Sequence, residues 1–90
     1  MTKEQVSYLQ MISFTLPNLR GMPVTHDHCF ARILLDTHFG GRWQKFLPSP
    51  AYKNLSAAEL KSLVCIGESV VRGETDIWQL NKTSKGYRGA

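Results

Sequence analysis

The sequence predicts an all-α protein, a small bundle of four to five helices with irregular, proline-containing connections. Apolar residues recur three or four positions apart in several segments, which is the spacing of one helical face. Ser, Thr, Gly and Pro stand where these segments begin and end, and no useful length of chain alternates as a strand does. With 90 residues, the chain suits one domain. We expect a single helical domain at 1–83 and a flexible basic C-terminal tail at 84–90.

The first helix is expected over residues 2–12. Thr2 and Gln5 have the spacing of a capping box, in which each side chain bonds the other's backbone. Pro17 stops any continuation, so residues 15–24 are expected to form a packed loop. Three apolar residues of the helix are expected to face the core: Val6, Leu9 and Ile12.

The central helix is expected over residues 25–39, with Thr25 as its N-cap and Gly40 as its end. Most of its circumference is apolar, which is typical of a helix that neighbours contact on several sides. Arg32 and Asp36 are four residues apart and are expected to form an ion pair at the surface. They belong to a narrow, water-facing polar strip that consists of His28, Arg32 and Asp36, with Phe39 at its end.

Beyond Gly41, one or two helical turns around Trp43 are followed by an irregular connection that contains Pro48 and Pro50. Residues 56–72 form the clearest helix. Ser56 and Glu59 make a second capping box there. Gly67 lies in the apolar stripe of this helix and, having no side chain, suits close approach by another helix.

A last short helix is expected over residues 75–83, with Thr75 as its cap. Net charge is +4, from 11 basic and 7 acidic residues, and no acid follows Asp76. The basic excess therefore collects at the C-terminal end, where it would attract phosphate backbones or acidic protein surfaces. Cys29 and Cys65 both lie in apolar helices and are expected to be buried free thiols.

No apolar run approaches the roughly 18 residues that cross a bilayer, and the first residues lack the apolar core of a signal peptide. We therefore expect a cytoplasmic protein with no membrane partner. His26 and Cys29 are spaced to share a site, but His28 and His38 lie elsewhere on the helix and no CxxC or HxxxH spacing occurs. We expect no metal, no cofactor and no catalytic residue, because no nucleophile or acid–base pair stands at a telling spacing.

The function expected from these observations is that of a small non-enzymatic binding or adaptor protein that acts through protein–protein contacts. Aromatic residues are numerous for so small a core, and aromatic side chains with Arg are enriched at interfaces. Phe39 falls in the polar strip, although it can also turn inward with Trp43. The partner is expected to be another protein or a second copy. The proposed contact residues are Arg32, Phe39, Arg42 and Trp43.

The alternative is a nucleic-acid-binding accessory or regulatory protein. Residues 56–72, a turn, and residues 75–83 have the outline of a helix-turn-helix pair. The second helix and the basic tail carry side chains that bond base edges or phosphates. Against this reading, Glu74 and Asp76 stand near the start of the second helix, where they would repel phosphates. The residues of this alternative are Gln79, Asn81, Lys82, Lys85 and Arg88.

Overall fold

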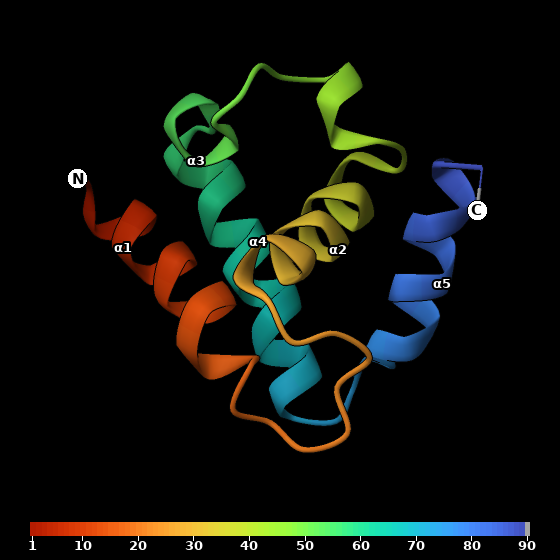
Figure 1. Ribbon diagram of the computed structural model, residues 1–90. Coiled ribbons are helices and arrows are strands. Elements are labelled where there is room, and N and C mark those ends of the chain that lie inside the picture. The colour runs from red at the N-terminus through yellow and green to blue at the C-terminus, as the bar shows by residue number, and fades with distance from the viewer. Residues whose placement is uncertain (90) are drawn as a thin grey trace.

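Figure 1 shows a computed structural model of the chain, in which residues 1–89 are described. Within these residues every regular element is helical, and the predicted all-α fold class is confirmed. None of these helices is both long enough and apolar enough to span a bilayer. In chain order the elements are α1 (Lys3–Gln10), the π-helical segment η1 (Met11–Thr15), α2 (Asp27–Phe39), the 3-10 turn η2 (Trp43–Lys45), α3 (Ala51–Asn54), α4 (Ala57–Val71) and α5 (Ile77–Tyr87).

Helix α2 is the central element of the fold. It contacts η1, α4 and α5, whereas α1 packs mainly along α4. Figure 1 shows α1 and α5 on opposite sides of the molecule, with α2 and α4 between them. Because neighbours surround α2, four of its apolar side chains are almost completely removed from water: Phe30, Ile33, Leu34 and Leu35.

Residues at the helix ends determine where several of these helices begin and end. Both predicted capping boxes are present, one at the start of α1 and one at the start of α4. Gly40 ends α2 with φ of 70°, a left-handed conformation that glycine adopts without strain. Two predicted caps are wrong. The N-cap of α2 is His26 rather than Thr25, and that of α5 is Asp76, whose carboxylate accepts from the Trp78 backbone N–H.

The predicted core stripe of α1 is rotated. Val6 is 49% exposed, whereas Tyr8, Met11 and Ile12 are buried. The spacing i, i+3, i+4 of these three residues fits a helical face as well as the predicted stripe does. Burying the face with the large Tyr8 ring removes more apolar surface from water, which favours the observed rotation.

Gly67 and Met11 bring α4 and the α1–η1 segment close together. A Cβ atom on Gly67 would lie 2.7 Å from both Cγ and Sδ of Met11. The close approach expected at Gly67 is therefore confirmed. The expectation of two buried thiols is wrong for Cys65, which is exposed on α4, while Cys29 is half-buried.

The C-terminal segment is part of the fold as far as it is described. Helix α5 runs to Tyr87, four residues beyond the boundary that was predicted for the domain. Arg88 then caps the helix and bonds the carboxylate of Asp36 on α2. The predicted tail at 84–90 is therefore helical at residues 84–87 and anchored at Arg88. Ala90, at its end, lies outside the described residues.

Candidate binding site around Arg32 and Trp43

A buried carboxylate joins α2, η2 and α5. Asp36 has no exposed surface. Its oxygens accept hydrogen bonds from Ser84 Oγ at 2.6 Å, from the Trp43 backbone N–H at 3.0 Å, and from Arg88 Nε and Nη2 at 3.1 and 3.0 Å. A buried charge is tolerated when it is paired and fully hydrogen-bonded in this way. The expected water-facing position of Asp36 and its ion pair with Arg32 are therefore wrong, because α5 covers this side of α2.

Arg32 lies one turn before Asp36 and bonds the same face of α5. Its Nη1 donates to Ser84 Oγ and its Nη2 donates to Asn81 Oδ1, each at 2.7 Å. Ser84 thus accepts from Arg32 and donates to Asp36. Both Asn81 and Ser84 are buried, and sequence reasoning did not assign either of them to the packing of α5.

Arg32 and Arg88 line a recess of about 260 Å³ in the surface above this network. Arg88 also donates from Nη2 to Gln44 Oε1 at 3.0 Å, and its side chain is 21% exposed. Two guanidinium charges therefore face one carboxylate, which leaves one positive charge in excess. We call this the cationic recess. Its walls are His28, Cys29, Arg32, Trp43, Gln44 and Arg88.

An apolar cavity of about 430 Å³ adjoins the cationic recess. Its volume lies within the range of small-ligand pockets, which are mostly apolar with a few polar groups that fix orientation. His28, Arg32 and Trp43 line both spaces, so the cavity and the recess meet at these three side chains. Residues of α1, η1, α2 and α3 supply the apolar wall, among them Tyr8, Leu9, Ile12, Leu35 and Tyr52.

Two of the four predicted contact residues line these spaces. Arg32 and Trp43 lie together between the two spaces. Phe39 is half-buried and stacks on Phe46, with ring centroids 5.0 Å apart, and it lines neither space. Arg42 is exposed and precedes the first residue of η2. Phe39 thus turns toward Phe46, a residue that is 53% exposed, rather than standing alone in the polar strip.

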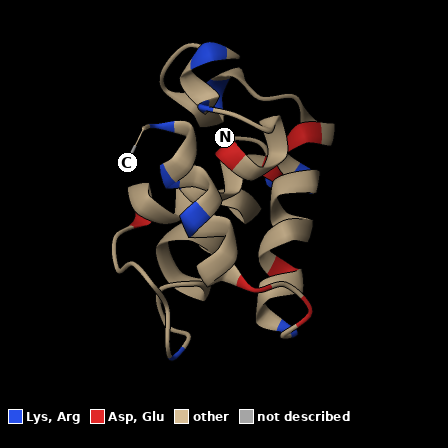
Figure 2. Cartoon of the chain, turned by 90° about the vertical axis from the view of Figure 1, so that its right-hand side faces the viewer, with Lys and Arg blue, Asp and Glu red and all other residues tan. Residues whose placement is uncertain are grey.

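The five residues of the nucleic-acid alternative are also divided. Asn81 and Arg88 belong to the internal network, whereas Gln79, Lys82 and Lys85 are exposed. Figure 2 looks onto the side of α5 and shows basic positions along this helix and near the C-terminus. Helix α5 packs on α2 rather than chiefly on α4, so the predicted helix-turn-helix pair has no close packing of its own.

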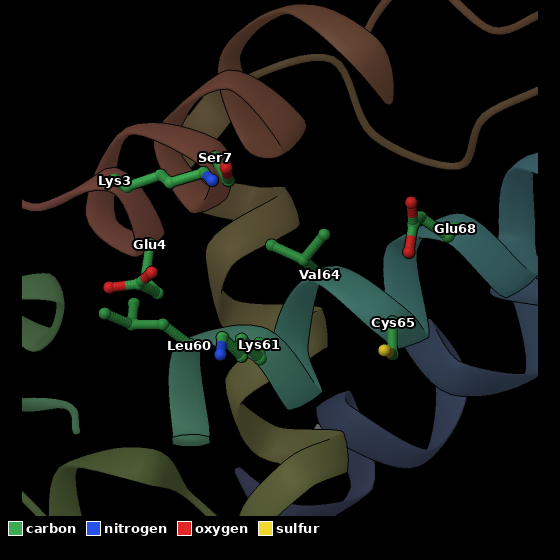
Figure 3. A pocket seen from close by; sticks show the side chains of 8 residues that line it. All are labelled: Lys3, Glu4, Ser7, Leu60, Lys61, Val64, Cys65 and Glu68. Atoms are coloured by element: carbon green, nitrogen blue, oxygen red, sulfur yellow. The ribbon is translucent and has the colours of Figure 1, made fainter. Parts of the chain in front are cut away.

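A separate groove lies between α1 and α4. Figure 3 shows Val64 between the two helices, with Lys3 and Ser7 on α1 and Cys65 and Glu68 on α4. Its volume is about 290 Å³, and its lining is mostly apolar.

The histidines do not gather into a metal centre. His26 and His28 stack with ring centroids 5.4 Å apart, and His38 Nε2 lies 3.9 Å from Glu59 Oε2. Across residues 1–89, no three His, Cys, Asp or Glu side chains are arranged to hold a metal ion.

Comparison with known proteins gives no relative for this chain. No protein-family model, no curated protein and no solved structure matches this chain.

Proposed function

We propose that the chain is a non-enzymatic binding or adaptor protein that acts through protein–protein contacts at Arg32 and Trp43. One observation carries the proposal: the cationic recess and the apolar cavity meet at these two side chains and at His28. Arg and Trp, with Tyr, are the residue types enriched among the strongest contributors to protein interfaces. The partner is another protein or a second copy of this chain.

The reactive groups beneath the recess support a binding role over a catalytic one. Asp36 and Ser84 are buried and bond each other, and both are held by arginine side chains. Groups so engaged stabilise the packing of α5 on α2. The groups that line the recess include guanidinium and amide donors, which bind and orient an anion, beside the His28 imidazole and the Cys29 thiol.

A blocking variant tests the proposal without removing any member of the network. Ala31 is half-buried and lines the apolar cavity, so Ala31→Gln fills part of it. Ala58→Gln, at an exposed position on α4, is the matched control. We expect affinity capture from the native cell, after nuclease treatment, to recover partners with the wild type and the control. Ala31→Gln should lose those partners while keeping the circular dichroism spectrum of the wild type.

Equal recovery by all three proteins would contradict a contact surface at this cavity. Sedimentation of the purified wild type and Ala31→Gln separates the two kinds of partner. If the partner is a second copy, the wild type should sediment as a dimer and Ala31→Gln as a monomer. If the partner is a different protein, both purified proteins should sediment as monomers.

The cytoplasm is the proposed compartment. Cys29 and Cys65 are both free thiols, which agrees with a reducing environment. Fractionation of the native cell tests this, and recovery with secreted proteins would contradict it.

Nucleic-acid binding is the second candidate, because Gln79, Lys82 and Lys85 are exposed on α5. A salt series with fluorescent DNA and RNA tests it, since each neutralised phosphate steepens the salt dependence of binding. This candidate predicts that Lys82→Gln and Lys85→Gln each weaken binding and flatten the salt slope by about one. Absence of binding to either nucleic acid at low salt would reject it.

A further inference from the structure

We propose that the cationic recess captures the free C-terminal carboxylate of a partner protein whose last side chain is apolar. The apolar cavity receives that side chain. This inference deepens the proposed adaptor function and rests on it, because it names the part of the partner that the site recognises.

The recess has an excess of positive charge that one negative group of a ligand would offset. Arg32 and Arg88 line the recess, and Asp36 lies buried beneath them. Asp36 bonds Arg88 directly and reaches Arg32 only through Ser84. Within the recess and the network beneath it, one carboxylate therefore faces two guanidinium groups, and a carboxylate arriving from solvent would meet the second positive charge. The Asp27 carboxylate, which is exposed, lines the adjoining cavity but not the recess.

The same arginines retain donors for that carboxylate. A guanidinium carries five N–H groups in a planar fork. Arg32 uses two of them, toward Ser84 and Asn81, and Arg88 uses three, toward Asp36 and Gln44. Within the described residues three N–H groups of Arg32 and two of Arg88 are left, enough for paired bonds to both oxygens of a carboxylate.

These donors are also held in place before a ligand arrives. Arg32 is fixed by two side chains of α5, and Arg88 is fixed by Asp36 on α2 and Gln44 in η2. A donor that is already ordered loses less conformational freedom when it binds, which favours recognition of one geometry.

The adjoining apolar cavity selects a chain terminus over an internal acidic residue. The recess and the cavity share Arg32 and Trp43, so the ligand must present a carboxylate and an apolar group a few bonds apart. The last residue of a protein carries both groups on one Cα atom. An internal Asp or Glu carries no apolar group of its own, and its chain continues in both directions.

The first test compares minimal mimics of a chain end. N-acetyl-L-leucine has the carboxylate and the apolar side chain, and N-acetyl-L-leucinamide has the same side chain without the charge. Each is titrated into ¹⁵N-labelled protein, and the Trp43 indole and Arg88 Nε–H signals are followed. We expect the acid to bind at least about tenfold more tightly than the amide. A hydrogen bond to a charged group contributes more binding free energy than a neutral one, and the difference corresponds to about a tenfold ratio of affinities. Equal binding of the two, or no binding of either, would overturn the proposal.

A charge variant keeps both arginines and tests the recess itself. Gln44→Glu places a carboxylate beside Arg88, where it competes with the ligand while it can still pair with the guanidinium. Gln10→Glu, at an exposed position on α1, adds the same charge outside the site and is the control. We expect Gln44→Glu to remove the tenfold preference for the acid and Gln10→Glu to leave it. An unchanged preference in Gln44→Glu would overturn the assignment to this recess.

Three further probes separate the sources of a carboxylate. Acetyl-Gly-Gly-Leu with a free C-terminus represents a protein end, acetyl-Leu-Asp-Gly-amide represents an internal acid, and isovalerate represents a small free acid. Tighter binding of the first supports the proposal, and equal or tighter binding of either other probe overturns it. Partner capture that Ala31→Gln abolishes would leave the adaptor function standing even when this preference fails. Capture that Ala31→Gln leaves intact contradicts the adaptor surface instead.

Discussion

Arg88 and Asp36 lie 52 residues apart in the chain and form a two-bond ion pair in the fold. Arg88 Nε donates to Oδ2 at 3.1 Å, and Nη2 donates to Oδ1 at 3.0 Å. The two partners differ in their access to water, because Asp36 is completely buried while the Arg88 side chain is 21% exposed. The pair links the C-terminal end of α5 to the last turn of α2, and removing Arg88 leaves a carboxylate that cannot reach solvent.

Arg88→Gln is therefore expected to lower the free energy of unfolding by about 3 kcal/mol, the usual cost of leaving a buried charge without its partner. Lys85→Gln removes a charge from an exposed position on the last turn of α5 and should change stability by about 0.5 kcal/mol or less. Urea unfolding of both variants, followed by tryptophan fluorescence, measures the difference. Equal stabilities would show that the C-terminal arginine contributes no more than a solvated charge.

The parts of this fold that sequence predicted are those set by neighbours in the chain. The capping boxes at Thr2 and Ser56 each need only two residues three positions apart, and Gly40 ends a helix by its own conformational freedom. Gly67 was also interpreted correctly, because a missing side chain in an apolar stripe has few other uses.

The candidate site depended on contacts that no local pattern encodes. On a helical wheel, Arg32 and Asp36 stand four residues apart and look like partners, whereas in the fold Asp36 bonds Arg88 and Arg32 bonds Asn81. A polar strip on a helix is normally exposed to water. Here the packing of α5 on α2 buries Asp36 and leaves Arg32 half-buried, while His28 stays exposed. Asn81 and Arg88 were assigned to nucleic-acid binding, since the sequence does not reveal that they face α2.

The capping box at the start of α4 provides a prediction about local stability. Ser56 Oγ accepts from the Glu59 backbone N–H at 3.1 Å, and Glu59 Oε1 accepts from the Ser56 backbone N–H at 2.9 Å. Ser56→Ala leaves one of these helix-end donors without its partner and should cost about 1 kcal/mol. For a domain of this size, that loss lowers the midpoint of thermal unfolding by about 4–8 °C.

Ser62→Ala is the matched control for this cap. Ser62 is exposed within α4, where alanine has the better helix propensity, so its replacement should leave the midpoint unchanged or raise it. A fall of the same size in both variants would mean that Ser56 acts as an ordinary helix residue rather than as a cap.

Gly67 and Gly86 are both helical glycines, yet alanine should affect them in opposite directions. A Cβ atom at Gly67 would lie 2.7 Å from two atoms of Met11, whereas one at Gly86 meets nothing within 4 Å. Gly67→Ala is expected to destabilise by about 1–3 kcal/mol through overpacking. Gly86→Ala is expected to stabilise by about 0.5–1 kcal/mol, because it improves helix propensity and adds no clash. Chemical unfolding of the two single variants measures whether each change raises or lowers the free energy of unfolding.

The contact with Met11 can be isolated by a double variant. Met11→Ala removes the atoms that a Cβ at Gly67 would strike, so adding Gly67→Ala to it should cost at least about 1 kcal/mol less than in the wild type. If the two changes are additive, the destabilisation of Gly67→Ala does not come from this close approach.

Tyr8 should make the fold sensitive to alkaline pH. Burial, with a smaller contribution from the nearby Asp27 carboxylate, raises the pKa of the Tyr8 phenol well above its ordinary value near 10. Above pH 10 the unfolded chain loses this proton while the folded chain keeps it, so the unfolded state binds fewer protons and stability falls as pH rises. One such group contributes a slope of up to about 1.4 kcal/mol per pH unit.

Tyr8→Phe removes the titrating group and keeps the ring that packs in the core. Urea unfolding at pH 8, 10 and 11 should show the wild type losing stability relative to Tyr8→Phe only above pH 10, with the two proteins close together at pH 8. Asp27→Asn removes the lesser cause of the raised pKa and should keep most of the alkaline loss, since burial is the larger cause. Parallel pH profiles of wild type and Tyr8→Phe up to pH 11 would show that the phenol titrates alike in the folded and unfolded chains. The alkaline sensitivity would then have to come from other groups.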